Sequence, residues 1–157
     1  MVEQRRLGRR IPLPSMHIDG LPPIGSFHHI GVATEGIADA ERTYAALGYA
    51  REGDEFCDPA QGVRGVFIVG PGPRLELLEA LGDSHTLDPW LRAGSRMYHL
   101  AFEVADLDGT LATARSELQA LVVRPPTPAP AFGGRRIAFV MLRNRALIEF
   151  VEADPFS

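Results

Sequence analysis

The 157-residue sequence contains no lysine, only one cysteine and no long apolar run. A single cysteine, Cys57, excludes a stapling disulfide, a Cys-x-x-Cys redox pair and a zinc ribbon, and it is typical of a reducing compartment. No window approaches the roughly 18 apolar residues of a membrane span. The segment after Arg10 is broken by prolines and has no apolar signal-peptide core. We therefore expect a cytoplasmic protein with no membrane partner.

Because lysine is absent, all 16 basic residues are arginine, and four of them lie within the first ten positions. These four arginines stand beside a single glutamate, so the start of the chain is positive and the rest is more negative than the net charge of −4. An acidic body repels phosphates, and no interleaved aromatic and basic residues follow the arginines. We expect no nucleic-acid partner and interpret residues 1–26 as an N-terminal arm.

An internal repeat is the most informative feature of the sequence. FHHIGVA at residues 27–33 and MYHLAFE at 97–103 are short apolar strands with histidine in third position, each followed by apolar residues at helical spacing. Residues 62–81 and 134–153 each contain a strand, a turn and a second strand, which carries two glutamates three positions apart (ELLE and EFVE). The elements recur in the same order at a nearly constant offset, which indicates duplication.

The repeat predicts an α+β chain in which each half has the order β-α-β-β-β. We expect one domain over residues 27–153, made of module 1 (27–81) and module 2 (97–153), because halves this small cannot bury separate cores. The connection should contain a short helix near residues 89–91, and Asp106 should cap the helix of module 2. The four prolines between residues 125 and 130 predict a stiff, extended loop.

Side-chain alternation along the two histidine strands predicts which residues share a face. It places Phe27 on the face of His29 and His28 on the opposite face. It likewise places Tyr98 opposite His99. In the last strand, Glu149 has apolar neighbours on both faces, so burying it requires a positive partner.

That partner is either an arginine or a metal ion. The arginines available are Arg64, Arg74, Arg135 and Arg136. Alternatively, two imidazoles and two carboxylates at matching repeat positions would form a pseudo-symmetric metal site: His29, Glu76, His99 and Glu149. Such mixed N/O ligation suits Zn, Co, Ni, Mn or Fe(II). The plainer alternative for each histidine is a core residue whose hydrogen bonds are satisfied locally.

The segments HHIGVAT, AQGVRGVFI, LELLEAL, YHLAFEV, FGGRRIAF and LIEFVE, in that order, resemble the vicinal oxygen chelate superfamily of glyoxalase-fold proteins, and most closely its methylmalonyl-CoA epimerase branch. The resemblance implies two βαβββ modules in a U-shaped mixed sheet around a divalent metal ion (Co, Zn, Ni, Mn, Mg or Fe). It implies that the ligands are His29, Glu76, His99 and Glu149. It also implies a homodimer.

The resemblance further implies a reaction in which a proton is abstracted alpha to a carbonyl or thioester, with an acyl-CoA or related carbonyl compound as substrate. Two positions depart from the epimerase pattern. Glu76 stands where glutamine is common, and Ala60 stands where an acidic residue serves as the proton-transfer base. Asp58, Glu76 or Glu149 would then have to act as the base.

Other interpretations of the same sequence remain open. Gln61, Arg135 and Arg136 are candidate substrate-binding residues, although the two arginines are equally well explained as exposed residues at a strand start. The protein could instead be a glyoxalase-fold lyase or isomerase of another small molecule, such as a secondary metabolite. A non-catalytic binding or resistance protein and an extradiol dioxygenase are further alternatives. Retention of all four ligand positions disfavours these last two.

Overall fold

The computed structural model describes residues 23–156, and the arginine-rich start of the predicted arm lies outside them. The elements of the described part follow in this order: β1 (Ser26–Ala33), α1 (Ile37–Ala45), β2 (Ala50–Asp58), β3 (Val63–Val69), β4 (Leu75–Ala80), α2 (Asp88–Arg92), β5 (Met97–Val104), α3 (Leu107–Glu117), β6 (Leu121–Pro128), the 3-10 segment η2 (Pro130–Phe132), β7 (Arg136–Met141) and β8 (Leu147–Glu152). The short helix α2 confirms the prediction for the connection. No helix in this part of the chain is long and apolar enough to cross a membrane.

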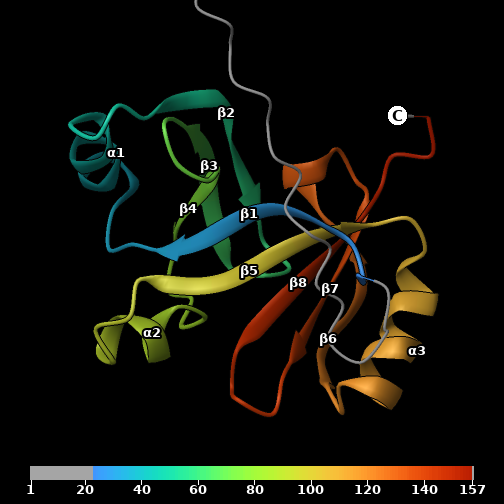
Figure 1. The fold of residues 1–157 in the computed structure, drawn as a ribbon. Helices are drawn as coiled ribbons and strands as arrows, with labels where there is room; N and C mark the ends of the chain where they lie inside the picture. Colours follow the sequence, from blue (N-terminus) through green and yellow to red (C-terminus); the bar gives the residue numbers. More distant parts are fainter. Residues whose placement is uncertain (1–22, 157) are drawn as a thin grey trace, which may run out of the picture.

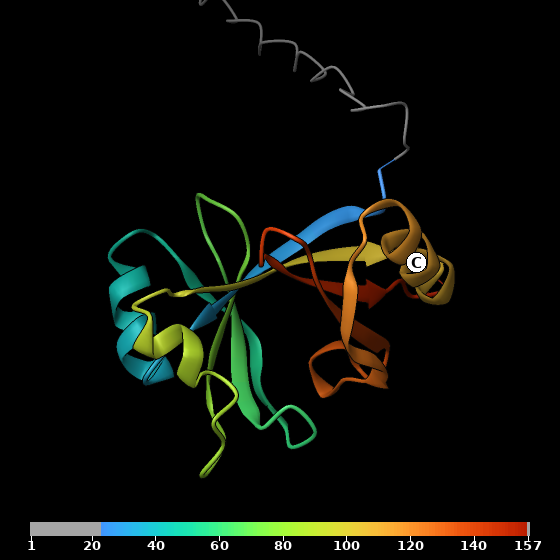
Figure 2. The ribbon, with the colours of Figure 1, turned by 90° about the horizontal axis from the view of Figure 1, so that it is seen from below.

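The strands form an eight-stranded sheet in the order β2-β3-β4-β1-β5-β8-β7-β6. β1 is parallel to β4 and β5 is parallel to β8, whereas β1 and β5 are antiparallel to each other. β1 and β5 cross the middle of the molecule in Figure 1, and in Figure 2 the other strands extend from them as two sides of a U. The α+β class and the U-shaped mixed sheet of two βαβββ units are confirmed.

The hydrophobic core consists of one cluster in each half of the sheet and a third cluster between the halves. One cluster, with Ile37 and Ile68, packs α1 against β3 and β4, and a second, with Leu107 and Ile148, packs α3 against β7 and β8. A third cluster lies inside the U and takes residues from both halves, among them Phe67 and Phe139. The two modules therefore share one interior, which is where a site between them must form.

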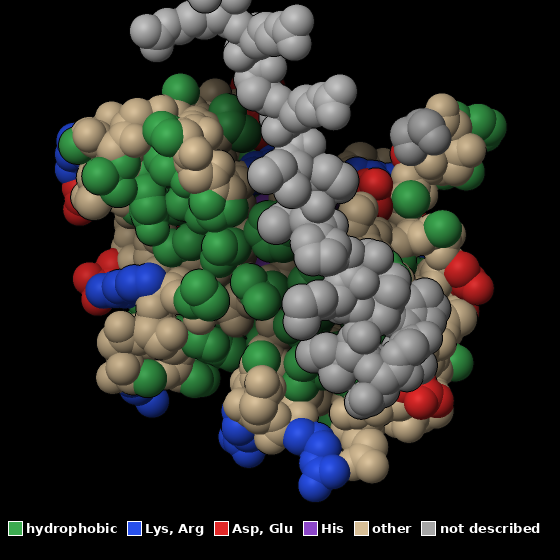
Figure 3. All heavy atoms as spheres, in the orientation of Figure 1, with side chains coloured by type: hydrophobic (Ala, Val, Ile, Leu, Met, Phe, Trp, Pro, Cys, Tyr) green, Lys and Arg blue, Asp and Glu red, His purple; other side chains and the backbone are tan. Residues whose placement is uncertain are grey.

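The convex face of the sheet retains apolar surface. Phe27, Leu47 and Met97 are among the exposed large apolar residues of the described part. Figure 3 views this face in the orientation of Figure 1 and shows hydrophobic side chains gathered over α1 and the neighbouring strands. The polar residues of interest lie on the other side of the sheet.

The proline-rich segment differs from its prediction as a loop. Residues 121–128 form β6, an edge strand that pairs with β7 through irregular register between Val122 and Thr127. The extended conformation was predicted correctly, but the pairing was not. Prolines lack an N–H group, so a sheet tolerates them on an edge strand, where one side of the strand needs no partner.

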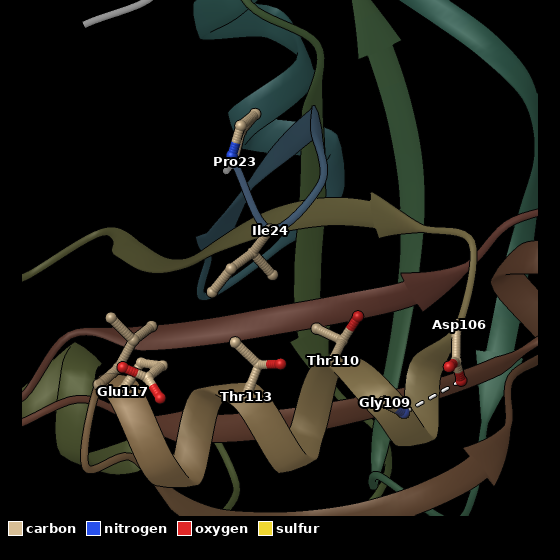
Figure 4. Close-up of a pocket in the computed structure, with 8 residues that line it drawn as sticks. Pro23, Ile24, Asp106, Gly109, Thr110, Thr113 and Glu117 are labelled. Atoms are coloured by element: carbon tan, nitrogen blue, oxygen red, sulfur yellow. Dashed lines mark hydrogen bonds between the residues drawn. The ribbon is translucent and has the colours of Figure 1, made fainter. Parts of the chain in front are cut away.

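The two long helices begin differently although they are repeat equivalents. Asp106 caps α3, and its carboxylate accepts a hydrogen bond from the Gly109 N–H at 3.0 Å, drawn as a dashed line in Figure 4. Gly36 precedes α1 and has no side chain to offer, so Glu79 of β4 accepts from the Ile37 N–H at 2.7 Å instead. Glu79, the second glutamate of ELLE, therefore caps α1 and is not part of the cluster inside the U.

We predict that Asp106→Ala lowers the free energy of unfolding by about 1 kcal/mol, because it removes a side-chain N-cap. Urea denaturation of the purified protein measures the change. The exposed Asp83→Ala, in the connection after β4, is the matched control and should change stability by less than about 0.5 kcal/mol. Equal effects of the two substitutions would contradict the assigned cap.

Candidate metal centre

Two rows of paired residues cross the inner face of the sheet. Each row contains a phenylalanine, a glutamate, a small residue and a histidine contributed by the other module. The first row is Phe67, Glu76, Gly31 and His99. The second is Phe139, Glu149, Ala101 and His29. Residues paired directly across neighbouring strands point to the same face, so the four predicted ligand side chains converge at the centre of the U.

The four side chains meet at hydrogen-bonding distances. His29 Nε2 lies 3.1 Å from His99 Nε2, 3.2 Å from Glu76 Oε2 and 3.3 Å from Glu149 Oε2. His99 Nε2 lies 3.4 Å from Glu76 Oε2 and 3.3 Å from Glu149 Oε2. One donor atom from each residue lies within 4.8 Å of all the others. The structure therefore brings together all four residues that the repeat selected.

The cluster is buried as deeply as the apolar core. The exposed fractions are 0% for His29, 1% for Glu149, 2% for His99 and 4% for Glu76. The rings of Phe67 and Phe139 lie 5.2 Å, between centroids, from those of His29 and His99 respectively. Two carboxylates in such surroundings are tolerated only if positive charge accompanies them.

In the absence of a metal ion, protonation of the imidazoles is the source of positive charge that the cluster itself offers. Burial by itself would lower the pKa of His29, but the Glu76 and Glu149 carboxylates outweigh it and raise this pKa to about 9. The pKa of His99 also rises, for the same reason. Burial would raise the pKa of Glu76, yet His29 and His99 lower it to about 2. The pKa of Glu149 falls as well, against the opposing effect of burial, chiefly through His99.

Protonation of the histidines leaves some buried polar atoms of the cluster without hydrogen bonds. The arrangement of these atoms fits a bound metal ion. His99 Nδ1 is buried without a hydrogen-bond partner among the described residues, and Glu149 Oε2, although 3.3 Å from both Nε2 atoms, forms an aligned hydrogen bond with neither. Metal–ligand bonds of about 2.1 Å would place neighbouring donors about 3.0 to 3.4 Å apart in octahedral or tetrahedral geometry, close to the five separations above. Imidazole nitrogen with carboxylate oxygen is a donor set for Zn, Co, Ni, Mn or Fe(II). These residues could hold a divalent ion.

The predicted faces were wrong for the residue before each histidine. Phe27 pairs with Phe102 while His29 pairs with Ala101, so His28 is an extra residue in β1. A β-bulge of this kind breaks the alternation of faces. His28 thus joins the inner face, with its ring centroid 5.6 Å from that of Phe132, and Phe27 packs outside on Phe102.

Tyr98 is the corresponding extra residue in β5, because Gly31 pairs with His99 while Val32 pairs with Met97. Its ring packs inside the U against Trp90 and His99, with centroid distances of 4.6 Å and 4.9 Å. Strand alternation cannot reveal a bulge, and the matching positions of these two inner-face residues in the repeat are their one sequence signal.

The other predicted site residues have partners within the chain. Asp58 is buried, and its two carboxylate oxygens accept hydrogen bonds from the Gln61 main-chain N–H (3.1 Å) and side-chain amide (2.8 Å). Asp58 pairs with Val63, four residues along β3 from Phe67, which pairs with Glu76. At about 3.3 Å per residue, the levels of Asp58 and Glu76 in the sheet are roughly 13 Å apart along the strand direction.

The two candidate arginines lie near the end of β8. Arg135 donates to Glu103 Oε2 at 2.8 Å and to the Glu152 carbonyl at 3.0 Å. Arg136 donates to both carboxylate oxygens of Glu152 and to Asp108. Acidic side chains of the same molecule thus occupy both guanidinium groups, and a substrate would have to displace them. A role in substrate binding stays a prediction for both.

A surface cavity of about 380 Å³ lies elsewhere, between α3 and the chain before β1 (Figure 4). Its lining includes Ile24, Thr110 and Thr113, and none of the four clustered residues. Because it is separate from the buried His and Glu side chains, we do not assign it to the chemistry of the metal centre.

Comparison with known proteins identifies the family. Residues 28–139 match the model of the Glyoxalase/Bleomycin resistance protein/Dioxygenase superfamily. This match extends over well more than half of the chain, and the protein belongs to this superfamily. The fold predicted from the repeat and the family implied by the resemblance are thereby confirmed.

Three relatives with known names are methylmalonyl-CoA epimerases. The mitochondrial enzyme of Dictyostelium discoideum is 24% identical over 140 residues, covering 87% of this chain and 83% of the relative. The crystal structure of the enzyme from Mycobacterium tuberculosis superimposes with a TM-score of 0.70 at 26% identity, covering 83% of this chain and 89% of that one. An epimerase solved in complex with methylmalonyl-CoA and NH4+ gives a TM-score of 0.69 at 25% identity, covering 83% and 96%.

The small residues in the two rows leave space for the histidines. A Cβ atom on Gly31 would lie 2.2 Å from Cε1 of His99. We predict that Gly31→Ala displaces this imidazole and weakens Zn²⁺ or Co²⁺ binding at least about tenfold, as other losses of ligand support do. Competition with a chromophoric chelator measures the affinity. Ala101→Gly, at the equivalent position, removes a side chain without a clash and should stay within about threefold of wild type.

The raised pKa of His29 predicts how the metal-free protein responds to pH. Its value rises from 6.5 to about 9 on folding, so the stabilisation is fully present below pH 6.5 and is lost as pH increases through 9. Urea unfolding with a chelator present should show stability falling between pH 6.5 and 9. Glu76→Gln removes the main cause of the raised pKa and should flatten this decline. A wild-type stability that increases over this window would contradict the assignment.

Proposed function

We propose that this protein is a divalent-metal-dependent epimerase or isomerase that removes a proton alpha to the carbonyl of a thioester, with acyl-CoA compounds as the substrate class. The observation that carries the proposal is the convergence of two imidazoles and two carboxylates in one buried cluster. The methylmalonyl-CoA complex of a similar structure supports the substrate class.

His29, Glu76, His99 and Glu149 would hold the ion. When bound, a divalent ion supplies Lewis acidity that polarises the substrate carbonyl and makes the adjacent C–H bond more acidic. The chain supplies the positions of the donors, fixed by strand pairing, and an interior from which water is excluded. Both features strengthen electrostatic effects at the reacting group.

We assign the general base to Glu149. Asp58 holds the turn before β3 through Gln61, and its level in the sheet is remote from Glu76. Glu149 Oε2 is buried at the centre of the cluster, 3.3 Å from both imidazole Nε2 atoms but in an aligned hydrogen bond with neither among the described residues. A carboxylate that is already ionised and has a free lone pair can accept a proton from a neighbouring carbon. The same carboxylate is one of the two that would hold the ion.

Substrate has to reach the cluster past aromatic side chains. Phe132 of η2 lies between β6 and β7, and its ring centroid is 6.0 Å from that of His29. Phe67 lies 5.8 Å from Phe132, again between centroids. We infer that the acyl group enters where η2 approaches β3, displacing Phe132, so that the reacting carbon meets a dry site.

Glu76 makes this centre more negative than one with glutamine at the same position. Two carboxylates already neutralise a divalent ion, so an anionic substrate group would be attracted less strongly. This difference favours thioesters or ketones in which the chelating oxygens are neutral. It also keeps open a glyoxalase-fold lyase or isomerase that acts on another small molecule.

Solvent deuterium exchange tests the proposed reaction. Metal-loaded protein in D2O should incorporate deuterium at C2 of methylmalonyl-CoA or a related acyl-CoA, as measured by mass spectrometry. Glu149→Gln removes a carboxylate that would also hold the ion, so bound metal is measured alongside, and the exchange rate per bound ion should fall at least about 100-fold, the scale expected when a general base is removed. Glu41→Gln on α1, which contacts Arg51, is the matched control and should exchange normally.

The outcomes separate the alternatives. Stoichiometric metal without exchange on any acyl-CoA would overturn the epimerase proposal in favour of another lyase or isomerase reaction. Absence of metal would favour a non-catalytic binding protein, and iron-dependent oxygen uptake would favour a dioxygenase. The expected cytoplasmic location and homodimer remain predictions; the Dictyostelium relative is named as mitochondrial.

A further inference from the structure

His28 stands directly behind the proposed ligand His29, as a result of the bulge in β1. Its ring is half-buried and packs edge-on to three neighbours on the inner face, with centroid distances of 5.1 Å to His29, 5.6 Å to Phe132 and 6.3 Å to Phe67. Without the extra residue, this side chain would face the opposite side of the sheet. The bulge therefore places a second imidazole beside the cluster, outside the set of four donors.

The contact between the two histidines joins their Nδ1 atoms at 2.8 Å. His29 directs its other nitrogen, Nε2, at Glu76, His99 and Glu149. An imidazole that binds a metal ion through Nε2 carries its hydrogen on Nδ1 and donates it to a nearby acceptor, which fixes the ring's orientation. His28 Nδ1 is the acceptor that the fold supplies.

The far side of His28 contacts an arginine. Arg74 Nη1 lies 3.1 Å from His28 Nε2, and Arg74 Nε donates to Glu52 Oε2 at 2.7 Å. Arginine can only donate, and a neutral imidazole has one bare nitrogen. His28 therefore accepts a hydrogen bond from Arg74 or from His29, but not from both at once.

The second module lacks this arrangement. Tyr98 occupies the equivalent bulge, but His99 Nδ1 has no hydrogen-bond partner among the described residues. Packing against Trp90 holds the Tyr98 ring in place. The ring of His29 is thus held by a hydrogen bond, whereas the ring of His99 is held by packing against Tyr98.

We propose that His28 is a positioning residue for the metal ligand His29, and that Arg74 competes with His29 for the single lone pair of the His28 ring. The inference rests on the metal centre of the proposed function and not on the reaction carried out there. It implies that binding of a metal ion at the buried site is coupled to the hydrogen bonding of the Arg74–Glu52 pair at the surface.

Three substitutions test the positioning role through Zn²⁺ and Co²⁺ affinity, measured by chelator competition. His28→Phe keeps a ring to pack on Phe132 but removes the acceptor, and should weaken binding ten- to a hundredfold, the range for loss of a ligand's hydrogen-bond partner. His28→Asn places an amide oxygen near the lost Nδ1 and should recover most of the affinity. Tyr98→Phe is the matched control in the other module and should leave the affinity unchanged.

Arg74→Met tests the competition. It preserves an apolar stem over Phe67, above which the guanidinium now lies at 4.4 Å from the ring centroid, and removes the competing donor. It should bind the ions at least as tightly as wild type, and we expect about threefold tighter. Weakening comparable to that of His28→Phe would show that Arg74 anchors His28 and would overturn the competition.

A measurement on the wild-type protein tests the proposal even if the variants fail to fold. Nitrogen-15 spectra of the Zn²⁺-loaded wild type should show His29 with its hydrogen on Nδ1 and His28 with its hydrogen on Nε2. A hydrogen on His28 Nδ1 in the loaded protein, or an unchanged affinity in a folded His28→Phe variant, would overturn the positioning role. A wild-type protein that binds neither ion would overturn the metal centre itself, a failure that these assays distinguish.

Discussion

The fold is organised around two carboxylates that cannot be buried alone. Glu76 and Glu149 lie in the middle of an apolar interior, and each requires a positive partner that the surrounding aliphatic and aromatic residues cannot provide. Each glutamate contacts the histidine of its own half and also the histidine of the other half, with which it shares a row of the sheet. Closing the U therefore brings each carboxylate its second imidazole. The shared core and the cluster depend on the same approach of β1 to β5.

Much of this could be predicted from the sequence because duplication makes chance agreement improbable. The positions of His29 and His99 were informative as a pair, since a single histidine in a strand has many ordinary explanations. Glu149 was informative because its neighbours along the strand are apolar, so that burying its carboxylate requires a positive partner. The helices, the short connecting segment and the cap at Asp106 followed from local patterns that need no tertiary information.

The remainder could not be predicted because it depends on registers that only the folded sheet defines. The bulges at His28 and Tyr98 insert one residue each, and the alternation rule then assigns both side chains to the wrong face. The missing N–H groups of the prolines before Pro130 predict a loop, whereas an edge position makes these residues compatible with a strand. The partners of Arg135 and Arg136 are likewise residues remote in sequence.

The crossed rows have a consequence for how the sequence can change over time. Gly31 belongs to module 1, but the side chain that fills the space beside it is His99 of module 2, and Ala101 of module 2 pairs with His29 of module 1. A substitution in one half therefore changes the position of a histidine that the other half supplies. At these positions the two copies of the repeat are not free to diverge separately, and variation in one should be accompanied by variation in the other.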